Sequence, residues 1–99
     1  MAPYYLKIDN KTFLIDFQFI INDLIYFVEY NGLQHYEPVR FGGRSKEKAI
    51  EALKKQQIRD ARLRTYCSEN NIILIEIDSR KITFDSIEFY LKNNIHKKD

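Results

Sequence analysis

Two acidic residues on neighbouring predicted strands, Asp16 and Glu29, are the first candidates for chemistry in this sequence. If Asn22-Asp23 forms a two-residue hairpin turn, counting outward from it by equal steps brings Asp16 opposite Glu29 on one face. Facing carboxylates repel each other, and a divalent cation can neutralise them. The pair therefore indicates a site for Mg²⁺ or Mn²⁺, unless one of the two acids simply lies in solvent at a sheet edge.

A histidine and a third acid extend this set. His35 comes six residues after Glu29, just past the end of the predicted strand, and an imidazole can act as a general base near neutral pH. Asp60 falls on the core-facing side of a predicted helix, where a carboxylate needs a partner. The alternatives are a salt bridge from Asp60 to Arg64 and a purely structural histidine. Together with Asp16 and Glu29, these residues form a reasonable set for metal-assisted phosphodiester hydrolysis.

Hydrophobic periodicity predicts the elements that would position these residues. We expect strands over residues 3–8, 12–21, 24–31 and 72–77, turns at 9–11 and 22–23, and helices over 46–69 and 84–93, with Thr83 as a cap. In the second strand Phe13, Ile15, Phe17 and Phe19 alternate with Leu14, Asp16 and Gln18. The order β-β-β-α-β-α predicts an α/β or α+β fold, with one helix crossing between two strands of a sheet.

The predicted helix over 46–69 is amphipathic. One arc gathers Ala49, Ile50, Leu53, Ala61 and Cys67, and Asp60 lies within it. The opposite side carries Lys48, Lys55, Arg59 and Arg62. The first arc is therefore expected to face the core, and the second to face solvent or a ligand.

Composition limits the class of protein. Ninety-nine residues suit a single domain spanning residues 1–99, with residues 92–99 as a basic, partly frayed tail. One cysteine, Cys67, excludes an intrachain disulfide and fits a reducing, cytoplasmic location. The sequence shows no apolar run of membrane-spanning length and no secretory signal.

Basic charge is concentrated in one segment, although the net charge is only +2. From Arg40 to Arg64 the chain carries nine Lys and Arg residues against three acids. Candidates for contacting a DNA backbone are Arg40, Arg44, Lys46, Lys54, Lys55 and Arg59. A solvated helix face is the alternative for Lys48, Lys55 and Arg62.

The segments IDFQFIINDLIYFVEYNGLQHY and RDARLRTYCSENNIILIEI together carry a family resemblance, over roughly residues 12–78. They resemble the nuclease domains related to very-short-patch repair endonucleases, which include the EDxHD homing endonucleases and belong to the PD-(D/E)xK superfamily. The resemblance implies a restriction-endonuclease-like core and metal-dependent cleavage of DNA, in homing, repair or a mobile element.

The same resemblance implies a role for each residue. Asp16 would bind the catalytic Mg²⁺, and Glu29 would complete the metal shell. His35 would activate or orient the attacking water, and Asp60 would orient that histidine or help to hold the metal. Gln34 would contact the phosphate or the metal shell.

The sequence departs from the family pattern at three places. Asn31 and Leu63 stand where many relatives carry lysine, and no segment before residue 3 supplies the usual N-terminal helix with its glutamate. These departures keep open an alternative: a catalytically inactive DNA-binding or protein-assembly module with the same fold. A homodimer, or a DNA-specificity domain in a larger parent protein, would be compatible with either function.

Overall fold

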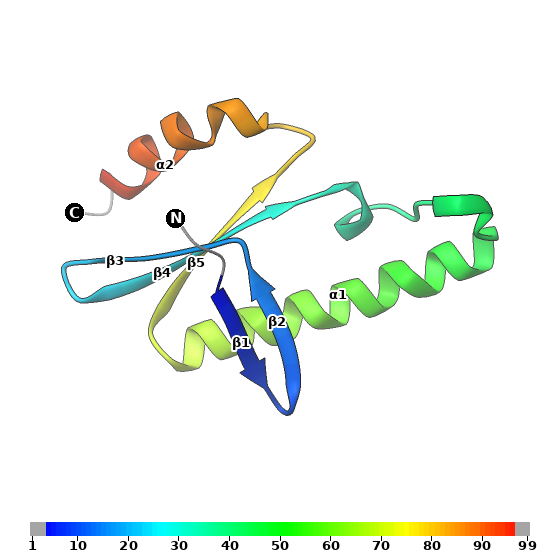
Figure 1. Cartoon of the computed structure of the whole chain (residues 1–99), viewed down its shortest axis with the longest axis horizontal. Coiled ribbons are helices and arrows are strands. Elements are labelled where there is room, and N and C mark those ends of the chain that lie inside the picture. The colour runs from blue at the N-terminus through cyan, green and yellow to red at the C-terminus, as the bar shows by residue number, and fades with distance from the viewer. Residues whose placement is uncertain (1–3, 97–99) are drawn as a thin grey trace.

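The computed structural model describes residues 4–96, and the side chains of these residues apart from 41, 84 and 94–96. Its elements in order are β1 (Tyr4–Ile8), β2 (Lys11–Ile15), β3 (Phe17–Ile21), β4 (Leu24–Asn31), α1 (Lys46–Glu69), β5 (Ile72–Asp78) and α2 (Ile87–His96), with short 3₁₀ turns at Leu33–His35, Phe41–Gly43 and Phe84–Ser86. The predicted mixture of helices and strands is confirmed, and the architecture is α+β (Figure 1).

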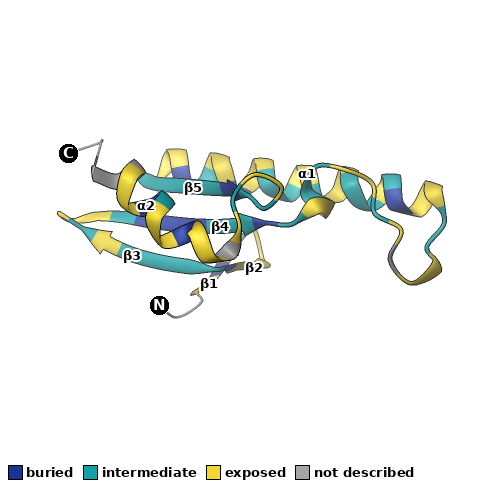
Figure 2. Cartoon of the chain, turned by 90° about the horizontal axis from the view of Figure 1, so that it is seen from above, coloured by how far each residue is buried: buried dark blue, intermediate teal, exposed yellow. Residues whose placement is uncertain are grey.

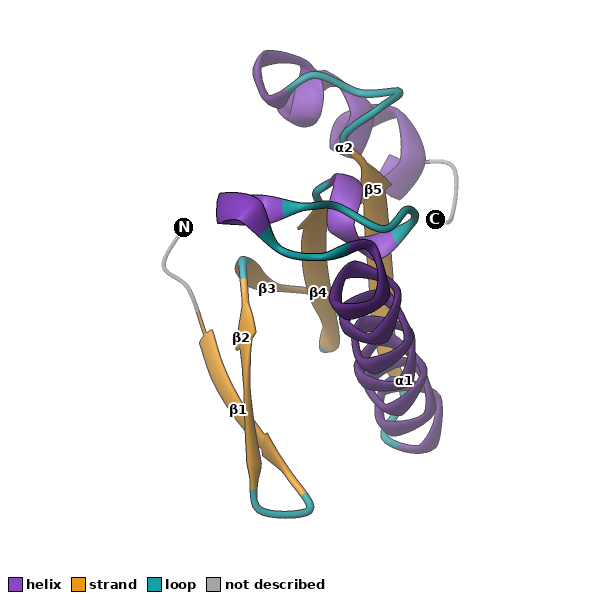
Figure 3. Cartoon of the chain, turned by 90° about the vertical axis from the view of Figure 1, so that its right-hand side faces the viewer, coloured by secondary structure: helices purple, strands orange, loops and turns teal. Residues whose placement is uncertain are grey.

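The strands form two separate sheets. β1 and β2 make an antiparallel ribbon that stands apart from the three-stranded sheet β3-β4-β5 (Figure 3). Both hairpins turn on two residues with positive φ, Asp9-Asn10 and Asn22-Asp23. Asn and Asp tolerate this left-handed conformation better than most residues, because their short polar side chains can bond the nearby backbone. The predicted turn at Asn22-Asp23 is confirmed, with Ile21 opposite Leu24.

The single strand predicted over residues 12–21 is wrong, because the chain bends at Asp16. Pairing between β1 and β2 ends at Ile15, and pairing between β3 and β4 begins at Phe17. The residues on either side of the bend enter different cores. Phe13 and Ile15 pack in one, whereas Phe17 and Phe19 pack against the other. Alternation of apolar residues continues through the bend, so the pattern alone does not reveal it.

Strands β4 and β5 belong to one sheet and are joined through α1, as the sequence predicts, and they run parallel with Glu29 in register with Glu76. Helix α1 covers one face of this sheet and α2 the other (Figures 1 and 3). Buried residues concentrate in β4, the central strand (Figure 2). The core beneath α1 contains Leu6, Phe13, Ile15, Phe27, Leu63 and Cys67. The core beneath α2 contains Tyr26, Val28, Ile77, Ile87 and Leu91.

Helix α1 has the predicted bounds. Ser45 caps its first turn by accepting a hydrogen bond from the Lys48 N–H at 3.2 Å. Of the predicted core arc, Ala49 and Cys67 are buried. Ala61 is exposed, contrary to the prediction, because it lines an open groove between α1 and the β1–β2 turn. The buried residue in that part of α1 is Leu63.

The C-terminal helix begins later and ends later than predicted. A 3₁₀ turn precedes α2, and the Thr83 hydroxyl bonds the Ser86 hydroxyl at 3.0 Å rather than a backbone N–H. Of the predicted basic tail over 92–99, residues 92–96 belong to α2, and 97–99 lie outside the described residues. No helix within the described range is long and apolar enough to cross a membrane.

Packing of β2 can be tested with two adjacent residues. Ile15 is 0% exposed and Leu14 is 50% exposed. Ile15→Ala should lower the free energy of unfolding by about 2–5 kcal/mol, because it leaves a cavity next to Cys67 and Phe27. Leu14→Ala should change it by no more than about 0.5 kcal/mol. Urea denaturation of both variants measures the difference, and equal effects would contradict the alternation seen in β2.

Candidate functional site

Asp16 and Glu29 are joined through the backbone at the bend. The Asp16 N–H donates to Glu29 Oε1 at 3.0 Å, and the Tyr30 N–H donates to Asp16 Oδ2 at 2.8 Å. These two bonds replace the strand ladder at the point where it is interrupted. The expected ladder pairing of Asp16 with Glu29 is therefore absent, but the two carboxyl groups remain neighbours. Among the residues that the structure describes, the second oxygen of each carboxyl has no hydrogen-bond partner.

His35 and Asp60 form the second half of the site. The histidine Nδ1 lies 2.9 Å from Asp60 Oδ2, and the side chains are 14% and 13% exposed. The other carboxylate oxygen of Asp60 accepts a hydrogen bond from Gln56 Nε2 at 2.9 Å. The predicted approach of Asp60 to His35 is confirmed. The alternative partner, Arg64, instead makes a two-point contact with Glu76 at 2.8 Å.

The parallel register explains how these groups meet. Residues on the face of the sheet toward α1 are apolar at the start of β4 and β5, where Phe27 and Leu74 join the core beneath the helix. Further along the same face stand Glu29 and its partner Glu76. Because α1 runs back over this face, Asp60 and Arg64 meet the polar end of the sheet.

Burial and like charge act together on Glu29. Desolvation by burial raises the pKa of Glu29 from 4.5 to about 7, and the negative charges of Asp16 and Asp60 add to the rise. The Asp16 N–H and the His35 ring oppose it. Burial also raises the pKa of Asp60, but hydrogen bonds from His35 and Gln56 outweigh this effect and lower it overall. The site therefore contains one carboxyl with a raised pKa, Glu29, and one with a lowered pKa, Asp60.

The donor set bears on metal binding. Within the described part of the chain, no group of three or more His, Cys, Asp or Glu side chains is arranged to hold a metal ion. Two adjacent carboxylates with free oxygens nevertheless fit Mg²⁺, which keeps several waters and often takes only one or two protein carboxylates. Asp16 and Glu29 are the residues that would hold it.

Gln34 lies beside this site rather than within it. Its side-chain amide folds against Gly32, where a Cβ would collide with it. It also lines a cavity of about 190 Å³ together with Arg44 and Gln56, and Gln56 is the residue that bonds Asp60. Gln34 is thus one side chain away from the His35–Asp60 pair.

The predicted DNA-binding residues differ in how far they are engaged within the protein. Lys46, Lys54 and Lys55 are exposed on α1. Arg40 Nε donates to the Arg44 carbonyl at 3.0 Å, and Arg44 Nη1 lies 3.5 Å from the Val39 carbonyl. Arg59 is only partly exposed: its guanidinium lies 4.4 Å from the Phe13 ring centroid and donates to the Thr12 carbonyl at 3.3 Å. Arg59 therefore ties α1 to β2, which limits its reach toward a phosphate.

Three polar contacts near the site were not predicted from the sequence. The Asn31 side chain opposes the rise in the pKa of Tyr36 that burial causes, and Arg80 lies 4.1 Å from the Tyr36 ring centroid. Arg64 holds Glu76 beside the site. An aromatic residue next to a candidate histidine is the one signal that pointed to Tyr36; the other contacts depend on how β5 registers with β4.

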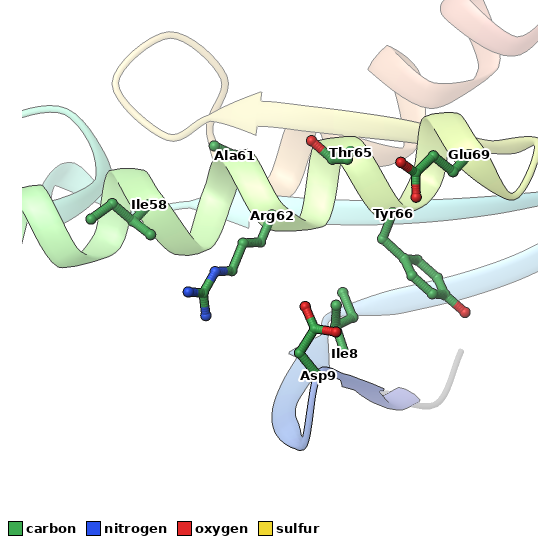
Figure 4. Close-up of a pocket in the computed structure, with 8 residues that line it drawn as sticks. All are labelled: Ile8, Asp9, Ile58, Ala61, Arg62, Thr65, Tyr66 and Glu69. Carbon is green, nitrogen blue, oxygen red and sulfur yellow. The ribbon is translucent and has the colours of Figure 1, made fainter.

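A larger hollow lies away from these residues. A groove of about 430 Å³ runs between α1 and the β1–β2 turn (Figure 4). It is lined by Ile8, Asp9, Ile58, Ala61, Arg62, Thr65, Tyr66 and Glu69. None of the predicted site residues is among them, so the groove is distinct from the carboxylate site.

Comparison with known proteins gives relatives without an assigned activity. No family model matches the chain, and no solved structure matches it. Over 68 residues it is 40% identical to uncharacterized protein 307L of Invertebrate iridescent virus 6, a match covering 69% of this chain and 31% of that protein. Over 50 residues it is 48% identical to uncharacterized protein 033L of Invertebrate iridescent virus 3, covering 50% of this chain and 24% of that protein. The chain thus spans less than a third of the length of these relatives.

The raised pKa of Glu29 predicts a pH dependence of stability. Between pH 4.5 and about 7 the folded chain keeps a proton on Glu29 that the unfolded chain releases, so stability falls as the pH rises through this range. Glu29→Gln removes that fall and keeps an oxygen to accept the Asp16 N–H. Above pH 7 the variant should be more stable than the wild type, by about 1–2 kcal/mol after allowance for solvent screening. Urea denaturation at pH 5 and pH 8 measures this, and an equal pH dependence in both proteins would refute it.

Proposed function

We propose that this chain is a metal-dependent DNA endonuclease domain with a restriction-endonuclease-like core. The observation that carries the proposal is the His35–Asp60 hydrogen bond beside the Asp16–Glu29 pair. A general base oriented by a carboxylate, next to two carboxyl groups suited to Mg²⁺ or Mn²⁺, matches the requirements of phosphodiester hydrolysis. The sequence resemblance to very-short-patch repair-like nucleases supports the same assignment of residues.

His35 would take the proton from the attacking water. With Nδ1–H donated to Asp60, the lone pair of the neutral ring lies on Nε2, which is the atom that can accept the proton. Asp60 fixes the tautomer and stabilises the imidazolium that forms, as in other carboxylate–histidine pairs. The water oxygen then bonds to phosphorus, the bond from phosphorus to the leaving deoxyribose oxygen breaks, and that oxygen takes a proton from solvent.

Asp16 and Glu29 would hold the divalent ion. When bound, Mg²⁺ polarises the scissile phosphate and makes the attacking water more acidic. The exposed Lys46, Lys54 and Lys55 of α1 would add a contribution to DNA affinity that does not depend on sequence. Gln34 would contact the phosphate or waters from the edge of the site.

A second function, DNA binding or protein assembly without cleavage, is favoured by two observations. The described residues contain no three-ligand metal group. The position of the family lysine is held by Asn31, which is buried and offers no positive charge. Nicking of plasmid DNA in Mg²⁺ or Mn²⁺, compared with EDTA, distinguishes the two functions.

Metal binding should depend on Asp16. Because a cation relieves the repulsion between the two acids, millimolar Mg²⁺ or Mn²⁺ should raise the melting temperature of the wild-type chain. Asp16→Asn should abolish that rise while leaving the metal-free protein equally or more stable, since one like charge is lost and an acceptor for the Tyr30 N–H remains. Asp23→Asn, the same change at the exposed hairpin turn, should keep the full metal response. If calorimetry detects no metal binding by the wild type, even with DNA present, the nuclease proposal fails.

The histidine should affect cleavage and not metal binding. His35→Ala should reduce the cleavage rate by a factor on the order of 10²–10⁴, the usual effect of losing a general base. Its metal-dependent rise in melting temperature should equal that of the wild type. Single-turnover cleavage of plasmid DNA, combined with thermal denaturation, gives both measurements. A His35→Ala variant that cleaves at the wild-type rate would remove this residue from the mechanism.

A further inference from the structure

The turn that carries His35 has little packing of its own. It is a single 3₁₀ turn, Leu33–His35, with no buried residue. Its backbone bonds are local: the His35 N–H donates to the Gly32 carbonyl at 3.1 Å, and the Tyr36 N–H to the Leu33 carbonyl at 2.9 Å. A short exposed turn of this kind fluctuates unless side chains tie it to the rest of the fold. The position of the imidazole therefore depends on contacts from elsewhere.

Tyr36, the next residue, supplies those contacts. Burial raises the pKa of Tyr36, and the nearby side chain of Asn31, which is 3% exposed at the end of β4, opposes this rise. The guanidinium of Arg80 lies over the Tyr36 ring, 4.1 Å from its centroid, and makes a cation–π contact. The His35 and Tyr36 ring centroids are 6.3 Å apart. One side chain thus joins the turn to β4 on one side and to Arg80 on the other.

Arg80 is itself held at the end of β5. Its Nη2 donates to Asp78 Oδ2 at 2.7 Å and its Nε to Asp78 Oδ1 at 3.0 Å, a two-point contact that fixes the plane of the guanidinium. Its Nη1 lies 3.6 Å from Oε2 of Glu37, which follows the turn by two residues. The Ser79 N–H also donates to the Asn31 carbonyl at 3.0 Å. The end of β5 is therefore bonded to β4 and to the histidine turn at the same time.

We infer that Arg80 and Tyr36 are positioning residues, which hold the histidine turn against the end of β5 so that His35 reaches Asp60. We call Asn31, Tyr36, Asp78 and Arg80 the tyrosine clamp. The inference rests on the proposed function, in which His35 is the general base. It also gives a structural role to Asn31: this residue anchors the clamp and does not take over the role of the lysine found at this position in the family pattern.

The clamp can be tested without any activity, by NMR of the His35 ring. In the wild type, long-range ¹H–¹⁵N correlations should show a single tautomer protonated on Nδ1. His35→Ala identifies these signals, because the chain has only one other histidine. Arg80→Gln should shift the two ring nitrogens toward averaged values. Lys81→Gln, which removes the same charge from the neighbouring exposed residue, should leave them unchanged. Unchanged ring signals in Arg80→Gln would overturn the inference.

Cleavage kinetics give the second measurement. Arg80→Gln should lower kcat on the order of 10-fold with little change in KM, the scale seen when a supporting contact is lost. Arg80→Lys, which keeps a cation but loses the two-point contact, should lie between. In a His35→Ala background, Arg80→Gln should have no further effect, because it acts through the histidine. An equal loss in both backgrounds would show a general structural role and overturn the inference. If the wild type cleaves no DNA, the proposed function fails, and the ring signals still decide the clamp.

Discussion

Between Ile15 and Phe17 the backbone leaves one sheet and joins another, and the hydrogen-bonding groups at the crossing must be satisfied without a strand ladder. Asp16 and Glu29 satisfy them: each carboxyl accepts a backbone N–H from the opposite strand. Buried backbone donors left without partners are costly, so this exchange allows the β1–β2 ribbon to pack beneath α1 while β3 stays with β4. The two-sheet arrangement therefore depends on the same carboxyl groups that form the candidate metal site.

This double use explains the electrostatics of the site. Glu29 must reach the Asp16 backbone, which brings its carboxyl into a partly buried region near two other acids and raises its pKa. A hydrophobic side chain there would avoid the repulsion but would leave the Asp16 N–H without its acceptor. The fold thus contains a carboxyl, Glu29, whose ionised form is destabilised. Such groups are common at functional sites, and elsewhere they only lower the stability of a protein. The repulsion is the property that a cation would relieve.

Local chemistry was sufficient to predict several parts of this fold. The Asn22-Asp23 turn follows from the tolerance of these residues for positive φ, and α1 follows from its hydrophobic periodicity. The bend at Asp16 was not predictable in the same way. Periodicity indicates that a side chain is buried, but it does not say in which core, so Phe13 and Phe17 look equivalent in the sequence.

The candidate site also has a part that could be predicted from the sequence and a part that could not. The pairing of His35 with Asp60 was predictable only through the family resemblance, because the residues alone left a salt bridge from Asp60 to Arg64 equally open. The contacts of Asn31 with Tyr36 and of Arg80 with Asp78 were not, since they depend on the parallel register of β4 and β5, which brings Asn31 level with Asp78. Residue types alone gave no reason to connect positions so far apart in the chain.

The partner of Asp60 is decided by a competition that involves a third residue. Arg64 lies one helical turn from Asp60, and its positive charge helps to lower the pKa of that carboxyl. A guanidinium prefers a carboxylate that it can contact at two points, and Glu76 offers this at 2.8 Å. Because Arg64 is occupied there, the oxygens of Asp60 remain for His35 and Gln56. The Arg64–Glu76 pair thus has two effects. Arg64 neutralises the charge of Glu76 beside Glu29, and Asp60 is left free to orient His35.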